Sequence, residues 1–163
     1  MQKATKIRSG VLLAALLVGL VATIFATRSS GAGTAKLVTT ANNKTLGKTI
    51  LVNSMGRSLY SLSVERQGKF ICKTSSCLSI WMPLAVRTGT KPAGVAGLGT
   101  IKRPDGKIQV AYRGAPLYAF SHDTKRVDVK GNGFKDVGVW RVVAVSKGTT
   151  APAATAPAPG YHY

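Results

Sequence analysis

Cys72 and Cys77 are the only cysteines of the chain, and their C-x4-C spacing permits three kinds of chemistry. They can form a structural disulfide, cycle as a redox pair, or contribute to a metal site. The chain has only two histidines, His122 and His162, so a metal site would lack the nitrogen and sulfur ligands that zinc needs at close spacing. We therefore expect a disulfide, which pins local geometry across a short loop.

A second candidate is a polar cluster that occurs twice. Tyr118, His122 and Asp123 fall within one short segment, and Tyr60 and Glu65 repeat the tyrosine and the acid at the same spacing. Such groups can bind a cation or hydrogen-bond a ligand. The alternative, which we favour, is that a nearby carboxylate satisfies each tyrosine hydroxyl and fixes the following turn, because buried tyrosines usually find such a partner.

Signals for catalysis are weak along the whole chain. There is no Gly-x-Ser-x-Gly motif, and only five acids are present to supply paired carboxylates. The glycine-bearing segment 94–99 lacks the Lys-Ser/Thr of a phosphate loop, and we expect it to be a flexible connection. We predict a protein without enzymatic activity, catalytic residues, cofactor or metal.

The elements that must position these residues come in two copies. Residues 56–63 (GRSLYSLS) reappear as residues 114–121 (GAPLYAFS), an offset of 58 that also relates Tyr60 to Tyr118 and Glu65 to Asp123. Downstream the offset becomes 59 and relates Trp81 to Trp140. A period near 60 with two copies predicts a duplicated domain in which these tyrosines and tryptophans are paired core or near-core aromatics.

Short apolar or alternating runs separated by turn residues predict many strands. The expected strands are residues 36–41, 49–52, 58–64, 117–120 and 139–145, together with a hairpin of 100–103 and 107–113 around Pro104-Asp105-Gly106. We expect a turn at Asn42-Asn43 and one short helical turn within 74–81, capped by Ser75 or Ser76. The prediction is an all-β fold in which antiparallel repeats, about 46–88 and 104–147, form one sandwich or barrel.

Alternation shows which residues share a face in two of the expected strands. Tyr60, Leu62 and Val64 share one face of their strand. In the hairpin, Ile108, Val110 and Tyr112 alternate with Gln109, Ala111 and Arg113. We therefore expect one face of this strand to be buried.

The two ends of the chain differ from this body. Residues 1–35 hold a basic start, an uncharged apolar run over 11–26 and a Ser/Gly/Ala stretch, which predicts an apolar helix acting as a cleaved signal peptide or an uncleaved membrane anchor. Either form leaves the body, residues 36–147, outside the cytoplasm. The Ala/Pro/Thr-rich residues 148–163 are expected to form a disordered tail.

Charge is the strongest compositional signal. The chain carries 23 Lys and Arg against 5 Asp and Glu, a formal net charge of +18. Such a surface attracts polyanions, while scattered basic residues without a long run argue against a dedicated nucleic-acid arm. A second interpretation is an acidic habitat, because a fold with few carboxylates loses few stabilising pairs on protonation.

One segment carries a family resemblance. Residues 118–123 match the pattern Tyr-x-(Phe/Trp/Tyr)-x-x-Asp at Tyr118, Phe120 and Asp123, and Tyr60 with Glu65 forms a degenerate copy. The chain resembles, over about residues 36–145, the bacterial secreted repeats of unknown function that are described as lipoproteins. The resemblance rests also on Cys72, Cys77, Trp81-Met82-Pro83-Leu84, Asp105-Gly106, Gln109, Tyr112, Gly114, Pro116-Leu117 and Trp140.

The resemblance implies an extracytoplasmic location and no established activity. No cysteine precedes Cys72, so the lipid-attachment cysteine of that family is missing here. We expect an exported cell-envelope protein, secreted or membrane-anchored, whose basic surface binds acidic wall polymers or anionic lipid headgroups and no specific nucleic acid. The alternative is an extracytoplasmic redox or electron-transfer accessory that uses Cys72 and Cys77.

Overall fold

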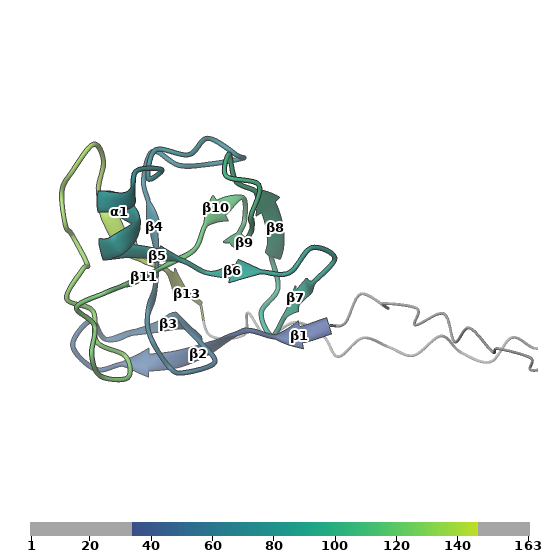
Figure 1. The fold of residues 1–163 in the computed structure, drawn as a ribbon. Helices are drawn as coiled ribbons and strands as arrows, with labels where there is room; N and C mark the ends of the chain where they lie inside the picture. Colours follow the sequence, from purple (N-terminus) through teal and green to yellow (C-terminus); the bar gives the residue numbers. More distant parts are fainter. Residues whose placement is uncertain (1–33, 147–163) are drawn as a thin grey trace, which may run out of the picture. The chain divides into compact units, whose positions relative to one another are not determined.

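The computed structural model describes residues 34–146, which are mostly β-structure with one short helix (Figure 1). The strands and the helix follow one another in this order: β1 (Thr34–Lys36), β2 (Val38–Asn43), β3 (Lys48–Asn53), β4 (Leu59–Leu62), α1 (Ser75–Ile80), β5 (Trp81–Pro83), β6 (Ala85–Val86), β7 (Lys91–Ala93), β8 (Leu98–Lys102), β9 (Ile108–Tyr112), β10 (Ala115–Pro116), β11 (Tyr118–Phe120), β12 (Trp140–Val142) and β13 (Ala144–Val145).

The central sheet has the strand order β12-β4-β11-β5, and all three of its pairings are antiparallel. Its middle pair joins β4 to β11 and sets Tyr60 directly opposite Tyr118. Two further sheets have the orders β13-β3-β2 and β10-β9-β6, with β8 also paired to β9. A parallel pair of β1 and β7 completes the pairings, and the described strands form no closed barrel.

The core consists of two groups of buried side chains. In the first, the indole rings of Trp81 and Trp140 stack with centroids 3.9 Å apart and planes 6° from parallel, and Tyr60 and Tyr118 meet them edge-on. The second is aliphatic and lies around Leu51, Leu59, Val110 and Leu117 with their neighbours. Large aromatic side chains bury much apolar area, so the first group supplies a dominant share of the stability.

Both edges of the central sheet are closed. On β5, the Trp81 N–H donates to the carbonyl of Cys77 in α1, and Pro83 has no N–H. On β12, the Trp140 N–H donates to the Phe134 carbonyl and the Val142 N–H donates to the Asn132 side chain. Occupied donors and an edge proline prevent another strand from adding to this sheet.

Helix α1 is short because its flanks favour extended backbone. Thr74 is the N-cap and accepts a hydrogen bond from the Cys77 N–H, so the predicted caps Ser75 and Ser76 lie inside the helix. At the other end Trp81 already has extended dihedral angles and begins β5. The predicted helical turn is confirmed, but it begins at least one residue earlier than the predicted caps suggested.

The predicted hairpin around Pro104-Asp105-Gly106 is confirmed as β8 and β9, whereas two other local predictions are wrong. Asn42 and Asn43 belong to β2, and the turn is residues 44–47, where Gly47 has φ of +60°. The segment 94–99 is held in place: Val95 is buried, and a Cβ on Gly94 would collide with the Val38 carbonyl.

The prediction of a single buried face for the hairpin strand β9 is also wrong, because Gln109 and Ala111 are buried on one face and Val110 and Tyr112 on the other. In β4, Tyr60 and Leu62 belong to the aromatic core group and Leu59 to the aliphatic one, while Val64, beyond the end of β4, is exposed. A strand that is covered on both faces need not alternate between apolar and polar residues, so alternation alone does not identify its buried side chains.

The expected N-terminal helix, the linker up to Gly33 and the C-terminal tail lie outside the described residues. Between residues 34 and 146, no helix has the length and apolar character needed to cross a membrane.

Candidate functional site

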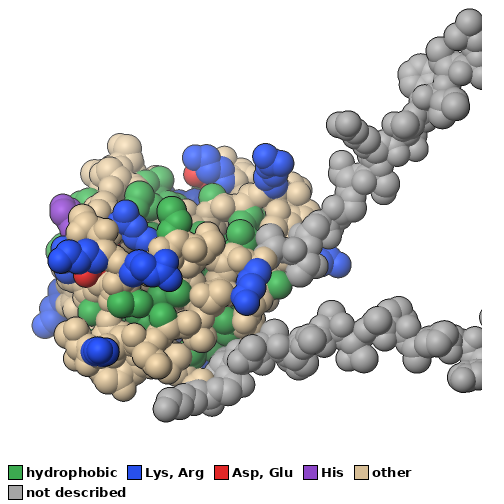
Figure 2. All heavy atoms as spheres, turned by 90° about the horizontal axis from the view of Figure 1, so that it is seen from below, with side chains coloured by type: hydrophobic (Ala, Val, Ile, Leu, Met, Phe, Trp, Pro, Cys, Tyr) green, Lys and Arg blue, Asp and Glu red, His purple; other side chains and the backbone are tan. Residues whose placement is uncertain are grey.

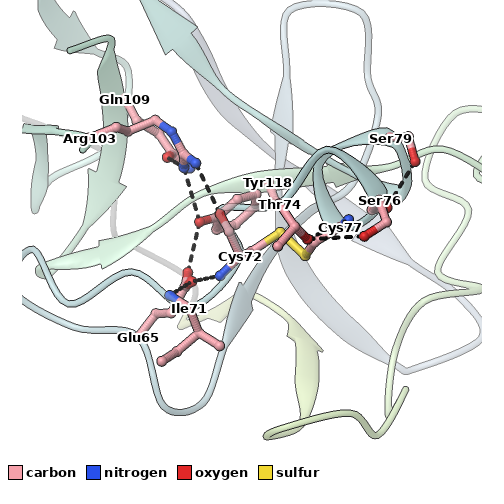
Figure 3. Close-up of a disulfide and its surroundings, with 10 residues drawn as sticks. All are labelled: Glu65, Ile71, Cys72, Thr74, Ser76, Cys77, Ser79, Arg103, Gln109 and Tyr118. Atoms are coloured by element: carbon pink, nitrogen blue, oxygen red, sulfur yellow. Dashed lines mark hydrogen bonds between the residues drawn. A yellow bond between two sulfur atoms is a disulfide. The ribbon is translucent and has the colours of Figure 1, made fainter. Parts of the chain in front are cut away.

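The first candidate site is a buried polar centre around Tyr118. Its hydroxyl donates to Glu65 Oε2 at 2.8 Å, and Glu65 Oε1 accepts hydrogen bonds from the N–H groups of Ile71 and Cys72 at 2.6 and 2.7 Å (Figure 3). Tyr118 and Glu65 have no exposed surface. Both carboxylate oxygens of Glu65 are therefore used to hold the chain that leads into the disulfide.

Arg103 supplies the positive charge of this centre. Its Nη1 donates to Gln109 Oε1 at 2.6 Å and to the Tyr118 hydroxyl at 3.3 Å, and its Nη2 donates to the Cys72 carbonyl at 3.0 Å (Figure 3). Its Nε lies 3.5 Å from Asp105 without a hydrogen bond. A guanidinium that is 3% exposed is tolerated because its neighbours satisfy most of its donors.

A second tyrosine–acid pair lies across the central sheet. The Tyr60 hydroxyl donates to Asp123 Oδ2 at 2.6 Å, and Asp123 Oδ1 accepts from the N–H of Lys130 at 3.0 Å. A guanidinium nitrogen of Arg57 donates to the Asp123 carbonyl. Here the positive charge meets the backbone, whereas Arg103 reaches into the side-chain network of the first pair.

The pairs are crossed relative to the sequence. Each tyrosine bonds the acid of the other predicted copy, so Tyr118 meets Glu65 and Tyr60 meets Asp123. The predicted cluster of Tyr118, His122 and Asp123 does not form. His122 is exposed, and the centroid of its ring lies 5.1 Å from the centroid of the Phe120 ring.

Burial fixes the protonation of the tyrosines. Desolvation, followed by hydrogen bonding and repulsion from the adjacent carboxylate, raises the pKa of both Tyr60 and Tyr118 well above the ordinary value. Burial likewise raises the pKa of Asp123, against the hydrogen bond from Tyr60. Neutral phenols act as hydrogen-bond donors, so this centre holds the fold together and is poorly suited to supply a base or a nucleophile.

Cys72 and Cys77 form the predicted disulfide, with their Cα atoms 5.5 Å apart. Cys72 is buried and Cys77 is half-buried beside a hollow of about 380 Å³ that Thr74, Ile80, Trp81 and Phe134 help to line. Among residues 34–146, no group of three or more His, Cys, Asp or Glu side chains converges as a metal site would require.

The second candidate site is the surface itself. Of the 18 Lys and Arg residues between positions 34 and 146, all except Arg103 are exposed or half-exposed. Two of the five acids, Glu65 and Asp123, are fully buried. Figure 2 shows one face with Lys and Arg spread widely over it and little acidic surface between them.

Two open grooves interrupt this surface where strands begin or end. The larger, about 680 Å³, lies at β6, the residues after β6 and the start of β9, with Arg87 and Lys107 among its lining residues. A smaller one, about 390 Å³, lies at β13 and the start of β3 and includes Lys48. In the described part of the chain, neither groove is lined by Tyr60, Tyr118 or the acids they bond.

Sequence reasoning missed Arg103 and the grooves. Nothing in an Arg-Pro-Asp-Gly turn marks its arginine as buried. The grooves had a signal in the sequence: Gly47-Lys48 and Gly106-Lys107 are 59 positions apart, and each pair lies where a strand begins.

Comparison with known proteins gives one match. No curated protein and no solved structure matches the chain. One family model matches a segment of the chain that runs from β8 to the start of β13. This segment includes Tyr118, Phe120, Asp123 and Trp140 but not Tyr60 or Glu65. Over these residues, 99–144, the chain matches the model of a family described as a secreted repeat of unknown function.

Proposed function

We propose that this chain is an exported, non-enzymatic envelope module whose basic surface binds acidic cell-wall polymers or anionic lipid headgroups. The match to a family described as secreted supports the extracytoplasmic location. The binding partner is inferred from charge.

The supporting observation is the separation of charges between surface and interior. Glu65 and Asp123 are buried and hydrogen-bonded within the fold, so they face no partner. Two of the remaining acids, Asp105 and Asp128, lie within 4 Å of Lys or Arg nitrogens. A surface with so few free carboxylates attracts polyanions over a distance set by ionic strength.

A non-enzymatic role fits the buried centre. Its hydroxyls and carboxylates bond one another and the backbone, and Tyr60 and Tyr118 have no exposed surface through which a substrate would reach them. Groups arranged in this way support structure and not turnover.

We also infer that the body is a duplicated unit. Ala144 lies opposite Ile50, and Ala85 lies opposite Gln109, so both members of one pairing differ from the other by 59 residues. The crossed tyrosine–acid bonds follow the same relation with an offset of 58. Two related halves would present related surfaces, which suits a partner that itself repeats.

Salt dependence tests the binding proposal. The full chain is expected to bind anionic vesicles and soluble acidic polysaccharide, and to lose that binding as the salt concentration rises from about 20 to 500 mM, because screening shortens the range of the interaction. Neutral vesicles and an uncharged polysaccharide are the controls. Binding that does not change with salt would refute the electrostatic proposal.

A redox role is the second candidate, because the half-buried Cys77 borders a surface hollow. Against it, Cys72 is buried, and its N–H and carbonyl bond Glu65 and Arg103. A redox function requires the disulfide to be reduced at potentials in the glutathione range, about −180 to −210 mV in an oxidising compartment.

A further inference from the structure

The groove at β6 and β9 combines an apolar floor with charged and hydroxyl groups. Leu37, Ala85, Val86 and Ile108 supply aliphatic surface, and Val86 also packs on the aliphatic core. Thr88 and Thr90, which carry hydroxyl groups, line the same groove. It is an open groove of about 680 Å³, so it can receive a segment of an extended molecule.

The positive charges of Arg87 and Lys107 in this groove are scarcely balanced by acidic groups of the protein. Within residues 34–146, the guanidinium of Arg87 makes no hydrogen bond or ion pair. Lys107 Nζ lies 3.9 Å from Asp105 Oδ2, a distant pair on an exposed side chain, and Asp105 also faces Arg103. Such a pair contributes little, which leaves Lys107 available to an anion.

A second groove occupies the corresponding place. It is lined by Gly47, Lys48, Thr49, Ala144, Val145 and Ser146, which lie 59 positions from Gly106, Lys107, Ile108, Ala85, Val86 and Arg87. Every lining residue of the smaller groove therefore has its counterpart in the larger one. A neighbouring hollow shares Gly47, Lys48 and Thr49 and adds Lys44, so this place too carries two cations.

We propose that the two grooves are paired subsites for a linear anionic polysaccharide. This inference rests on the proposed electrostatic function and assigns it a place and a ligand class. Arg87 and Lys107 bind acidic groups in the first groove. Lys48 binds them in the second groove, and Lys44 binds them in the hollow beside it.

The lining chemistry favours a sugar polymer over a lipid surface. The C–H faces of sugar rings pack on aliphatic side chains such as Val86 and Ile108, while ring hydroxyls hydrogen-bond Thr88 and Thr90. A polymer with an acid on each unit can occupy both grooves at once, and the second contact is then favoured by effective concentration. A headgroup would need the cations alone and would leave the aliphatic floor unused.

The test compares three variants that each remove two positive charges from the full chain. Arg87→Gln/Lys107→Gln alters the first groove and Lys44→Gln/Lys48→Gln alters the second, while Arg66→Gln/Lys69→Gln removes two exposed charges outside both. Affinity for polygalacturonate, a linear carboxylated polysaccharide, and the stoichiometry with its short oligomers are measured by calorimetry. Urea unfolding of each variant checks that it is folded.

Each groove variant should weaken polygalacturonate binding about tenfold or more, about 1.4 kcal/mol, and the control by less than about threefold. Wild type should bind two short oligomers and each groove variant one. If all three variants weakened polygalacturonate binding equally, the proposal that the grooves are the binding sites would be wrong. If that binding remained sensitive to salt, the proposed electrostatic function would still hold. Binding to anionic vesicles alone, unaffected by the groove variants, would also overturn the proposal. Salt-insensitive binding to both probes would instead refute the underlying function.

Discussion

At the scale of single residues, the Tyr118 hydroxyl links the side chains of Glu65 and Arg103 in the core. It donates to Glu65 and accepts from Arg103, so removing it leaves a buried carboxylate oxygen without this donor. We expect Tyr118→Phe to lower the free energy of unfolding by about 1–3 kcal/mol in urea titrations. Tyr112→Phe is the matched control, because Tyr112 is also buried but its hydroxyl forms no hydrogen bond within residues 34–146. Equal effects of the two substitutions would contradict this role for the hydroxyl.

Asp123 gives a pH dependence with a definite sign. Burial raises its pKa above 3.8 in the folded chain, so the folded state holds the proton more tightly than the unfolded state. Its stabilising contribution is therefore complete below pH 3.8 and is lost as the pH rises through the folded pKa. As the pH rises through the folded pKa of Asp123, the free energy of unfolding of the wild type should fall relative to that of Asp123→Asn. Asp128, whose pKa is lowered by hydrogen bonds from the Lys125 and Thr124 N–H groups and by Lys130, acts in the opposite direction in both proteins.

At the scale of elements, the disulfide fixes the segment between β4 and α1. It joins residues five positions apart, and loop-closure entropy for so short a loop amounts to about 2 kcal/mol. Cys72→Ala/Cys77→Ala should lower the free energy of unfolding by about that amount without abolishing the fold. Urea unfolding of the oxidised, reduced and substituted proteins measures this. A bond that opens readily in glutathione buffer would favour the redox alternative instead.

The stacked tryptophans leave no room beside Gly131. A Cβ on this glycine would lie 2.6 Å from Trp81 Cη2 and 3.0 Å from Phe120 Cγ. We expect Gly131→Ala to cost about 1–3 kcal/mol through overpacking, measured by thermal or urea unfolding. Gly99→Ala is the control, since its Cβ would meet nothing within 4 Å and neither glycine has a left-handed backbone. A tolerated Gly131→Ala would show that this part of the core can relax.

How far the sequence could predict these elements depended on the range of the interactions. The hairpin of β8 and β9 follows from a local turn tripeptide, and the internal similarity correctly indicated that Trp81 and Trp140 lie in the core. The burial of Arg103 and the crossing of the tyrosine–acid bonds depend on segments far apart in the chain. No local pattern encodes these contacts, because they arise only when distant segments come together, as when β4 pairs with β11.

At the scale of the whole molecule, the charge distribution predicts that salt affects stability and binding in opposite directions. Seventeen basic side chains reach the surface between residues 34 and 146 and repel one another, so screening them should stabilise the fold. We expect the melting temperature to rise by a few degrees between about 10 and 200 mM salt, while affinity for acidic polymers falls over the same range. Calorimetric melting and binding titrations in the same buffers measure both.

Melting measurements with added polysaccharide and at different pH separate the two explanations of the basic surface, a polyanionic partner and an acidic habitat. If the surface serves a polyanion, acidic polysaccharide at low salt should raise the melting temperature, because a ligand that binds the folded state stabilises it. If the surface reflects an acidic habitat, the melting temperature should change little between pH 7 and pH 3 and polysaccharide should add nothing. Three carboxylates remain outside the core, Asp105, Asp128 and Asp136, and of these Asp128 has a lowered pKa. Acid therefore removes few native pairs in either case, and the response to polysaccharide decides between the explanations.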